Sequence, residues 1–477
     1  MKSEVPIVPN LIPGRKMKIS LFTKILTQFF DITFYTVLLF LFASCTSESK
    51  ATSIAARKIE VADTIKEEDE DPLKDLGFKE IKLVKIIQSK VANPKEANSV
   101  YESAINSPKS VIYSKDGKKF YVNSLEGYTT VVFDSRTFKK IKEIRHKFNA
   151  ENNKLFKNNE NTVFDYQFKQ KKDEYNHFMG KPVESCLSHE GKYLWVTYYR
   201  RDWDPNAESP SAVAIIDTEK DEIVRVMPSG PLPKMVACSG DNKYVAVTHW
   251  GDNTVGLIDV SSEDPMDFRY VSHIVVDNRL AMNFAHSVNR DNSCGNCLRG
   301  TVFSPDNKKI LIAKMGGNGI AVIDVESKEY LGTITGSYLN LRHLVINQGD
   351  LVLSSNSYGM VQKAKLDDIL SVGFNEQKQL NFKGWQSISV GPGARTIDIT
   401  ENGKYIFACV NNACKVAVVD AKTMTKLTEI DAAPFPVGMA LSPDNKQLII
   451  TSQGKEGSAG SGNTVMVFEL VYDKVGG

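Results

Sequence analysis

Short apolar runs alternate with polar turns along most of the chain, and one turn pattern recurs. Each copy has a Ser or Thr, then turn residues that include Asp, Glu, Gly or Asn, then Lys and a second apolar run. A fixed pattern of this kind predicts an architecture built from structural repeats. The copies are SKDGKKFYV from Ser114, SHEGKYLWV from Ser188, SGDNKYVAV from Ser239, SPDNKKILI from Ser304, TENGKYIFA from Thr400, SPDNKQLII from Ser442 and a degenerate NQGDLVLSS from Asn347.

Each copy is flanked by further short apolar runs. One precedes the turn, as in RGTVF, and one follows the second run after a loop, as in TVGLID, GIAVID or KVAVVD. A fourth often follows the Asp that ends this run, as in SKEYLGTI. Asp-Gly and Asp-Asn turns supply the positive φ that a tight hairpin needs, so each repeat is predicted to be a four-stranded antiparallel sheet.

Seven such sheets predict an all-β fold, a seven-bladed β-propeller, because packing blades around an axis buries faces that no single blade can cover. The last copy supplies only three strands. The run Lys79–Gln88, which precedes the first repeat, is predicted to be its fourth strand and to close the ring. Residues 79–477 number 399, or 57 for each blade. This exceeds the roughly 40 to 50 residues of common propeller repeats, so the surplus is expected in loops.

Turns of the SPDNK type followed by strands such as GIAVID resemble the YVTN-type propeller repeat of bacterial extracytoplasmic proteins. The resemblance covers residues from about 105 to 471. It implies the propeller fold, but it is nearly silent on activity, because related propellers include binding proteins, scaffolds of redox enzymes and sugar lactonases.

The chain begins with a candidate export signal. From Met17 the sequence reads MKISLFTKILTQFFDITFYTVLLFLFASC, with a basic start, a short apolar run and small residues before Cys45. This arrangement resembles a bacterial lipobox and implies lipid attachment at Cys45; an uncleaved anchor or a cut elsewhere is the alternative. We expect a signal peptide over residues 1–44, with Met17 as a possible true start, a lipidated flexible linker over 45–77, and the propeller over 78–477.

Composition narrows the functional classes. The 477 residues are 42% hydrophobic and 24% charged, with 59 Lys and Arg against 57 Asp and Glu. These values exclude a disordered or polytopic membrane protein. The near-neutral balance also disfavours nucleic acid as a partner, because bulk positive charge is absent.

The surplus residues are predicted to gather on one face of the propeller. We call it the loop-rich face: the blade-to-blade connections and the second-to-third strand loops open there, whereas the repeat turns lie on the opposite turn face. Five insertions are assigned to it, at Lys147–Lys181, Tyr198–Pro210, His273–Cys297, Gly373–Gly384 and GKEGSAGSG. Long loops are functional or disordered, so this face is the candidate binding surface. The predicted loop-face residues are Tyr198, Tyr199, Arg200, Arg201, Trp203, His249 and Trp250.

A second pattern points to the central channel. Five residues before each turn Ser, or its equivalent, five of the seven blades have a basic residue, and the other two have Val183 and Val437. The starts of innermost strands converge on the channel, so counter-charge is required. Either acidic neighbours such as Glu184, Asp252 and Asp398 neutralise the cations, or an anionic ligand does. These channel-mouth cations are Lys109, Lys234, Arg299, Arg342 and Arg395.

Six cysteines besides Cys45 fit an oxidising compartment. Cys409 and Cys414 are predicted to form a disulfide across a hairpin, and Cys294 and Cys297 form a CGNC loop that is a disulfide candidate. Cys186 and Cys238 lie in the innermost strands of neighbouring blades, but their positions within the repeat differ by one residue. We therefore expect them to be buried and not bonded to each other. The seven histidines form no metal motif, and no nucleophile elbow, phosphate loop or carboxylate pair is recognisable. We therefore predict no catalytic residues, no metal and no cofactor.

These observations favour an exported lipoprotein of the bacterial cell envelope, anchored to the outer membrane on its periplasmic or outer side. Its propeller is expected to act as a non-enzymatic binding or scaffold module through the loop-rich face. Expected partners are the membrane, through the lipid anchor, another envelope protein or surface complex, and an anionic small ligand. The alternatives are a lactonase- or lyase-like propeller enzyme, and a propeller that binds anions or single-stranded nucleic acid.

Overall fold

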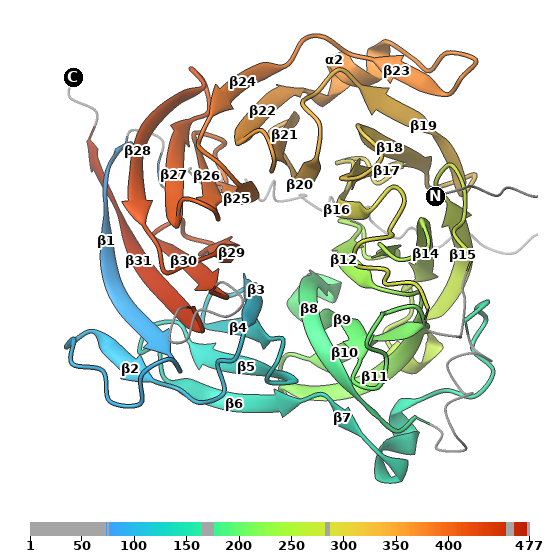
Figure 1. The fold of residues 1–477 in the computed structure, drawn as a ribbon, viewed down its shortest axis with the longest axis horizontal. Helices are drawn as coiled ribbons and strands as arrows, with labels where there is room; N and C mark the ends of the chain where they lie inside the picture. Colours follow the sequence, from blue (N-terminus) through green and yellow to red (C-terminus); the bar gives the residue numbers. More distant parts are fainter. Residues whose placement is uncertain (1–72, 74–75, 165–175, 282–286, 455–461, 475–477) are drawn as a thin grey trace, which may run out of the picture. The chain divides into compact units, whose positions relative to one another are not determined.

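The fold was determined as a computed structural model, which describes residues 73, 76–164, 176–281, 287–454 and 462–474 (Figure 1). Seven antiparallel sheets stand in a ring, and the innermost strand of each faces the centre (Figure 1). The predicted seven-bladed β-propeller is confirmed.

Blades 1 to 4 follow one another along the chain. Blade 1 contains β3 (Pro108–Tyr113), β4 (Lys119–Ser124), β5 (Thr129–Asp134) and β6 (Lys140–Arg145). Blade 2 contains β8 (Phe178–Ser188), β9 (Tyr193–Arg201), β10 (Ser211–Asp217) and β11 (Glu222–Ser229). Blade 3 contains β12 (Pro233–Cys238), β13 (Tyr244–His249), β14 (Thr254–Asp259) and β15 (Arg269–Val275). Blade 4 contains β16 (Leu298–Phe303), β17 (Lys309–Lys314), β18 (Ile320–Asp324) and β19 (Glu329–Thr335).

Blades 5 to 7 complete the ring. Blade 5 contains β20 (Leu341–Asn347), β21 (Asp350–Ser355), β22 (Met360–Lys365) and β24 (Gln386–Ser389). Blade 6 contains β25 (Ala394–Ile399), β26 (Tyr405–Val410), β27 (Lys415–Asp420) and β28 (Thr425–Asp431). Blade 7 contains β29 (Pro436–Leu441), β30 (Gln447–Ser452), β31 (Thr464–Lys474) and β1 (Leu76–Gln88).

The ring closes as the sequence predicts. Strand β1 pairs antiparallel with β31, from Leu76 opposite Lys474 to Gln88 opposite Thr464, so both ends of the propeller share blade 7 (Figure 1). It begins three residues before the predicted Lys79. Phe78 of β1 packs against Tyr405, Phe407 and Tyr472. The closing strand therefore also covers the core between blades 6 and 7.

The recurring turn has a hydrogen-bonding reason. In the first copy, Ser114 Oγ accepts from the backbone N–H of Lys119 at 3.0 Å, and Asp116 Oδ1 accepts from the backbone N–H of Lys118 at 3.1 Å. The turns at Ser239, Ser304, Thr400 and Ser442 repeat both bonds. Between the two polar side chains, the backbone reaches positive φ at Gly117, Asn242, Asn307, Gly403 or Asn445. The repeat signature thus encodes the turn that joins the first two strands of a blade.

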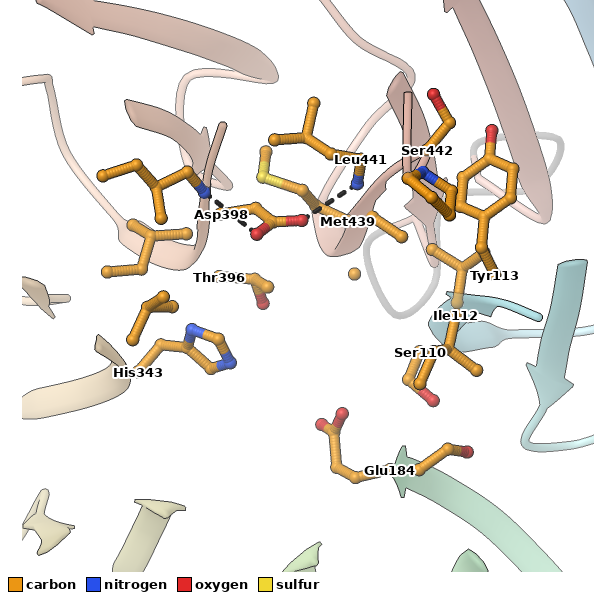
Figure 2. A pocket seen from close by; sticks show the side chains of 18 of the residues that line it. Ser110, Ile112, Tyr113, Glu184, His343, Thr396, Asp398, Met439, Leu441 and Ser442 are labelled. Atoms are coloured by element: carbon orange, nitrogen blue, oxygen red, sulfur yellow. Dashed lines mark hydrogen bonds between the residues drawn. The ribbon is translucent and has the colours of Figure 1, made fainter. Parts of the chain in front are cut away.

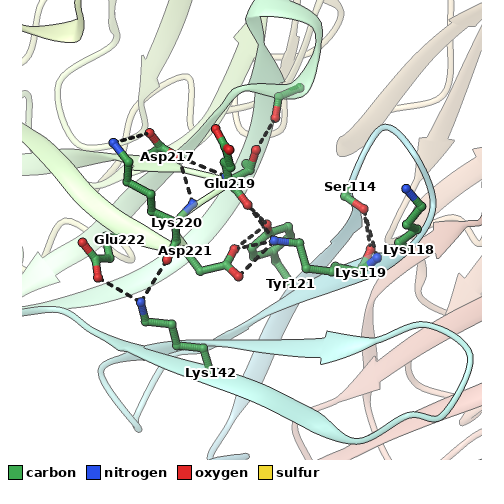
Figure 3. Close-up of polar contacts among 12 residues, drawn as sticks. Ser114, Lys118, Lys119, Tyr121, Lys142, Asp217, Glu219, Lys220, Asp221 and Glu222 are labelled. Atoms are coloured by element: carbon green, nitrogen blue, oxygen red, sulfur yellow. Dashed lines mark hydrogen bonds and ion pairs between the residues drawn. The ribbon is translucent and has the colours of Figure 1, made fainter.

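Neighbouring blades are also joined by ion pairs. Lys119 Nζ of blade 1 lies 2.9 Å from Asp221 Oδ1 of blade 2, and the same carboxylate accepts from the Tyr121 hydroxyl at 2.7 Å (Figure 3). Nearby, Lys142 reaches Glu222 at 3.1 Å (Figure 3). Both contacts fix the edge of blade 2 on blade 1.

Three short strands add to the blades: β2 (Ser99–Tyr101) pairs with β1, β23 (Gln379–Asn381) pairs with β19, and β7 (Lys147–Phe148) pairs with the start of the innermost strand β8. The helices of the described residues are α2 (Leu366–Ser371) and the 3-10 turns η1 (Ala150–Leu155), η2 (His189–Gly191) and η3 (Pro265–Asp267). None of these described helices has the length and apolar character that a bilayer crossing requires.

One insertion lies elsewhere than predicted. The stretch Gly373–Gly384 falls between β22 and β24, the third and fourth strands of blade 5, so it leaves from the turn face and not from the loop-rich face. Within it, β23 pairs in parallel with β19 on the rim of blade 4. The prediction was wrong because β24 was not recognised as the fourth strand of blade 5.

The cysteine predictions are corrected in part. Cys294 and Cys297 form the expected disulfide, but Cys409 and Cys414 are free thiols. Cys409 lies opposite Val416, two positions beyond Cys414, and its side chain is buried between blades 6 and 7. A second disulfide joins Cys186 to Cys238, whose Cα atoms are 6.1 Å apart on the neighbouring strands β8 and β12. The one-residue offset between the two repeat positions therefore does not prevent the bond.

Candidate functional site

All seven innermost strands contain a β-bulge at the same place. The pairing register shifts within 108–111, 182–185, 233–235, 298–301, 341–343, 394–397 and 436–438. Each shift encloses the position that the sequence places five residues before the turn Ser. A bulge bends a strand and redirects a side chain, so the bulges explain how one repeat position can face the channel in every blade.

The channel-mouth cations are largely buried. The exposed fraction is 8% for Lys109, 6% for Arg299 and 4% for Arg395. Burial is the largest influence on the pKa of Lys109 and lowers it. Arg395, Arg299 and Arg342 each lower this pKa further, so the charges of the four groups interact. Four of the five predicted cations thus interact electrostatically, and this interaction disfavours their charged forms.

Lys234 is held apart from the others by its own partners. Its Nζ lies 3.0 Å from Asp291 Oδ1 and 3.9 Å from the centre of the Trp250 ring. The Tyr199 hydroxyl donates to the same Asp291 carboxylate. Burial lowers the pKa of Lys234 to about 7, and Asp291 opposes that change. This cation is compensated by a carboxylate and two aromatic rings.

Arg299 also has an internal partner. Its Nη2 lies 3.1 Å from Glu184 Oε1, and its Nη1 donates to the backbone carbonyl of Lys234 at 3.3 Å. Glu184 comes from the bulge of β8 in blade 2, next to Val183, so a blade without a cation supplies the counter-charge. The expected neutralising role of Glu184 is confirmed for Arg299.

The remaining three cations, Lys109, Arg342 and Arg395, have no ion-pair partner within the described part of the chain. Arg342 Nη1 contacts Met315 Sδ at 3.4 Å, and the Arg395 guanidinium lies 5.4 Å from the centre of the Phe435 ring. The Nε atoms of both arginines are buried without a hydrogen-bond partner in these residues. Burial lowers the pKa of each of the three groups. The structure thus leaves a buried excess of positive charge.

Two predicted neutralising carboxylates lie elsewhere. Asp398 accepts from the backbone N–H groups of Ile399 and Leu441 at 2.9 Å, and burial raises its pKa to about 6. Asp252 accepts from Thr254 at 2.7 Å and lies 3.4 Å from Arg279. Neither carboxylate pairs with a channel-mouth cation, because each is bonded to other groups. Asp398 accepts from backbone N–H groups, and Asp252 is bonded to Thr254 and Arg279.

Residues of the innermost strands and of the turns that follow them line a cavity of about 620 Å³ (Figure 2). Its wall includes Ser110, Glu184, His343 and Thr396, each of which directly follows a bulge position in its strand. The Glu184 carboxylate and the His343 imidazole point into this space (Figure 2). This volume is typical of small-molecule sites. The sequence revealed the cation positions, but it contained no signal for the cavity.

The predicted loop-face residues separate into two groups. Tyr198, Arg201 and His249 are buried, and Trp203 packs against the core shared by blades 1 and 2. By contrast, Tyr199 and Trp250 surround Lys234 at the channel mouth, and Arg200 lies over the Tyr199 ring. Trp250 is itself 7% exposed, so within this second group only Tyr199 and Arg200 are partly exposed.

His249 illustrates why the first group is structural. Its Nε2 accepts from the backbone N–H of Gly230 at 3.1 Å, and its Nδ1 lies 2.8 Å from Thr254 Oγ1. Burial lowers its pKa well below the usual range. His286, another of the seven histidines, lies outside the described residues. No group of three or more metal-ligating side chains occurs in the described ranges.

Comparisons with known proteins support the fold alone. No protein-family model matches the chain, and no curated protein sequence matches it. Among solved structures, hydrazine synthase of Kuenenia stuttgartiensis aligns with a TM-score of 0.52 at 15% identity, over 77% of this chain and 96% of that one. The beta-propeller domain of Myceliophteria thermophila Cps50 (Swd1) aligns with a TM-score of 0.51 at 11% identity, over 77% and 98%. These two differ from each other in name and source, so the shared architecture does not define an activity.

Proposed function

We propose that this protein is an exported, lipid-anchored binding protein of the bacterial cell envelope. Its propeller takes a small anionic ligand at the channel mouth on the loop-rich face and does not transform it. The observation that carries the proposal is the excess positive charge of Lys109, Arg342 and Arg395, which have no ion-pair partner within the described residues and whose charged forms burial disfavours. Burying a charge without a partner is costly, so an anion that supplies the partner is stabilised strongly.

The surroundings of these cations also favour a ligand. Arginine guanidinium groups match the planar geometry of carboxylate and phosphate oxygens, and the buried Nε atoms of Arg342 and Arg395 are donors without acceptors in the described residues. The adjoining cavity of about 620 Å³ has room for the remainder of a small molecule. The burial of Lys109 and Arg395, which are 8% and 4% exposed, disfavours a protein surface as the partner, because a flat surface does not reach such side chains.

The cellular part of the proposal comes from the sequence. The apolar run before Cys45 and the polar stretch that follows it are the arrangement of a lipoprotein whose folded part stands away from the membrane. Cys45 lies outside the described residues. The resemblance to YVTN-type repeats agrees with an extracytoplasmic location. An envelope protein that binds the loop-rich face remains compatible with this arrangement and is a second partner to be sought.

Thermal unfolding with added anions tests the binding site. Phosphate and sulfate should raise the melting temperature relative to chloride at equal ionic strength, since a ligand that binds only the folded state stabilises it. The double change Arg342→Gln and Arg395→Gln should abolish this increase. Lys142→Gln, which removes an exposed cation on the outer strand of blade 1, is the control and should retain it. An equal increase in all three proteins would overturn the proposal.

A further inference from the structure

The charges around the channel determine how many negative charges a ligand needs in order to bind. Four cations lie within electrostatic reach of one another, because Arg299, Arg342 and Arg395 all lower the pKa of Lys109. Among the carboxylates of the described residues, Glu184 acts on this group and raises the pKa of Lys109, Arg342 and Arg395. Glu184 therefore offsets one charge of four.

Glu184 is placed where a ligand carboxylate would bind. It is ion-paired with Arg299 at 3.1 Å, and its side chain is 18% exposed on the wall of the cavity (Figure 2). An anion that binds the cations and extends into the cavity meets Glu184. Like charges repel strongly in a poorly solvated site, so this carboxylate acts as an internal competitor. A ligand with one negative charge gains little beyond what Glu184 already provides.

Proton occupancy of the lysines depends on the same charges. The groups that face Lys109 are Arg395 on β25, Arg299 on β16, Arg342 on β20 and Glu184 on β8, whereas β29 offers the uncharged Val437. Burial lowers the pKa of both Lys109 and Lys234. An added anion reverses this effect, because it stabilises the protonated amine.

We propose that the channel selects oxyanions with two or three negative charges, of the polycarboxylate or phosphate type, and that Glu184 determines this selectivity. Such a ligand places its charges against Lys109, Arg342 and Arg395, and its remaining atoms lie in the cavity. Binding takes up a proton from solvent onto a channel lysine, and no bond forms or breaks. This inference rests on the proposed function and specifies the class of ligand.

The test uses a series of acids that differ in charge but little in chain length: butyrate, glutarate and propane-1,2,3-tricarboxylate, with inorganic phosphate as a second arm. Isothermal titration calorimetry at pH 8 and fixed ionic strength, in two buffers of different ionisation enthalpy, gives the affinity and the number of protons taken up. Each added carboxylate should tighten binding at least about tenfold, a step that corresponds to 1.4 kcal/mol. Binding of the tricarboxylate should take up protons.

Glu184→Gln should tighten binding of butyrate and glutarate and thereby reduce the selectivity for high charge. Glu222→Gln, which removes an exposed carboxylate on the rim of blade 2, is the matched control and should change nothing. Lys109→Met should weaken binding of the tricarboxylate, because it removes one cation of the site. The failure of every anion to bind would overturn the proposed function itself. Equal affinity across the series, or an unchanged series in Glu184→Gln, would overturn only this inference. A stronger response to phosphate than to the tricarboxylate would assign the ligand to the phosphate arm.

Discussion

Arg299 Nη2 lies 3.1 Å from Glu184 Oε1, and this pair joins the innermost strands of blades 4 and 2 past the strand of blade 3 between them. Arg299 and Lys234 therefore each have a carboxylate partner. The other channel-mouth cations, Lys109, Arg342 and Arg395, have none in the described residues. The two classes should respond to substitution with opposite signs, because loss of a paired cation leaves a buried carboxylate behind.

The first prediction compares Arg299→Gln with Arg342→Gln. The change at Arg299 leaves Glu184 unpaired and should lower the free energy of unfolding by about 3 kcal/mol, the scale of a broken buried pair. The change at Arg342 removes a cation that has no ion-pair partner in the described residues and relieves repulsion, so stability should be unchanged or higher. Chemical denaturation in chloride buffer, without other anions, measures both. Similar losses in both variants would contradict the charge distribution described here.

The second prediction concerns ring closure. A chain that begins at residue 90 lacks β1 and exposes the core around Phe78 and Ile87, and it should lose several kcal/mol, since each large buried side chain contributes about 2 to 5 kcal/mol. A chain that begins at residue 73 should melt like the full chain. The start is placed there because Leu73 is 1% exposed and its carbonyl accepts from Lys404 Nζ at 2.7 Å. Equal melting temperatures for the two truncations would exclude a closing role for β1.

The blades could be predicted from the sequence because their signal is local. The Ser-to-backbone and Asp-to-backbone hydrogen bonds of each turn involve residues two to five positions apart, so the pattern is visible without tertiary knowledge. The channel position was visible for the same reason: a constant spacing from the turn Ser to Lys109, Lys234 and their counterparts persists through the bulge.

The partners of those cations could not be predicted, because pairing depends on contacts between blades. Glu184 lies four residues before its turn and pairs with Arg299 of another blade, whereas Asp398 lies two residues before its turn and accepts from the backbone N–H of Leu441. The dependence on contacts between blades also explains why the pairing of Cys186 with Cys238 was not predicted. A local hairpin suggested Cys409 with Cys414, whereas the disulfide that joins blades 2 and 3 required the spacing of β8 and β12.

The third prediction concerns the thiols. In Cys45→Ser protein that has been unfolded without a reductant, a thiol reagent should detect two thiols, Cys409 and Cys414. In the folded protein only Cys414 should react, because Cys409 is buried and its pKa is raised to about 12. Cys186→Ala should lower the free energy of unfolding by about 2 to 4 kcal/mol through loss of the disulfide between blades. A count of zero thiols would restore the Cys409–Cys414 pairing.

The fourth prediction tests the membrane anchor. Cys45→Ser should move the protein from the membrane fraction to the aqueous fraction, because acyl chains and not residues 32–43 are proposed to hold it. Wild-type protein should incorporate a palmitate analogue, and the variant should not. Cys414→Ser, which removes a thiol in a different region, serves as the labelling control. Absence of label on the wild type would overturn the lipoprotein assignment.

The last prediction concerns the pH dependence of stability. Burial lowers the pKa of Lys234 from 10.5 to about 7 in the folded protein. Between these two values the unfolded chain holds a proton that the folded chain lacks, so stability contributed by this residue rises with pH from about 7 to 10 and is lowest below 7. Lys234→Met lacks the titrating group. Its neighbour Asp291, whose pKa is lowered, is ionised throughout this window and adds only a constant loss.

The stability of wild-type protein should therefore rise relative to Lys234→Met by up to about 1.4 kcal/mol per pH unit over that window, as the single-site linkage relation requires. Urea unfolding at pH 7, 8, 9 and 10, in chloride alone, measures the difference. Added tricarboxylate should flatten the wild-type curve, because a bound anion keeps the lysine protonated to higher pH. The stability difference between wild type and Lys234→Met could instead stay constant from pH 7 to 10. Lys234 would then titrate as an ordinary solvated amine, and the charge at the channel mouth would be less buried than its position implies.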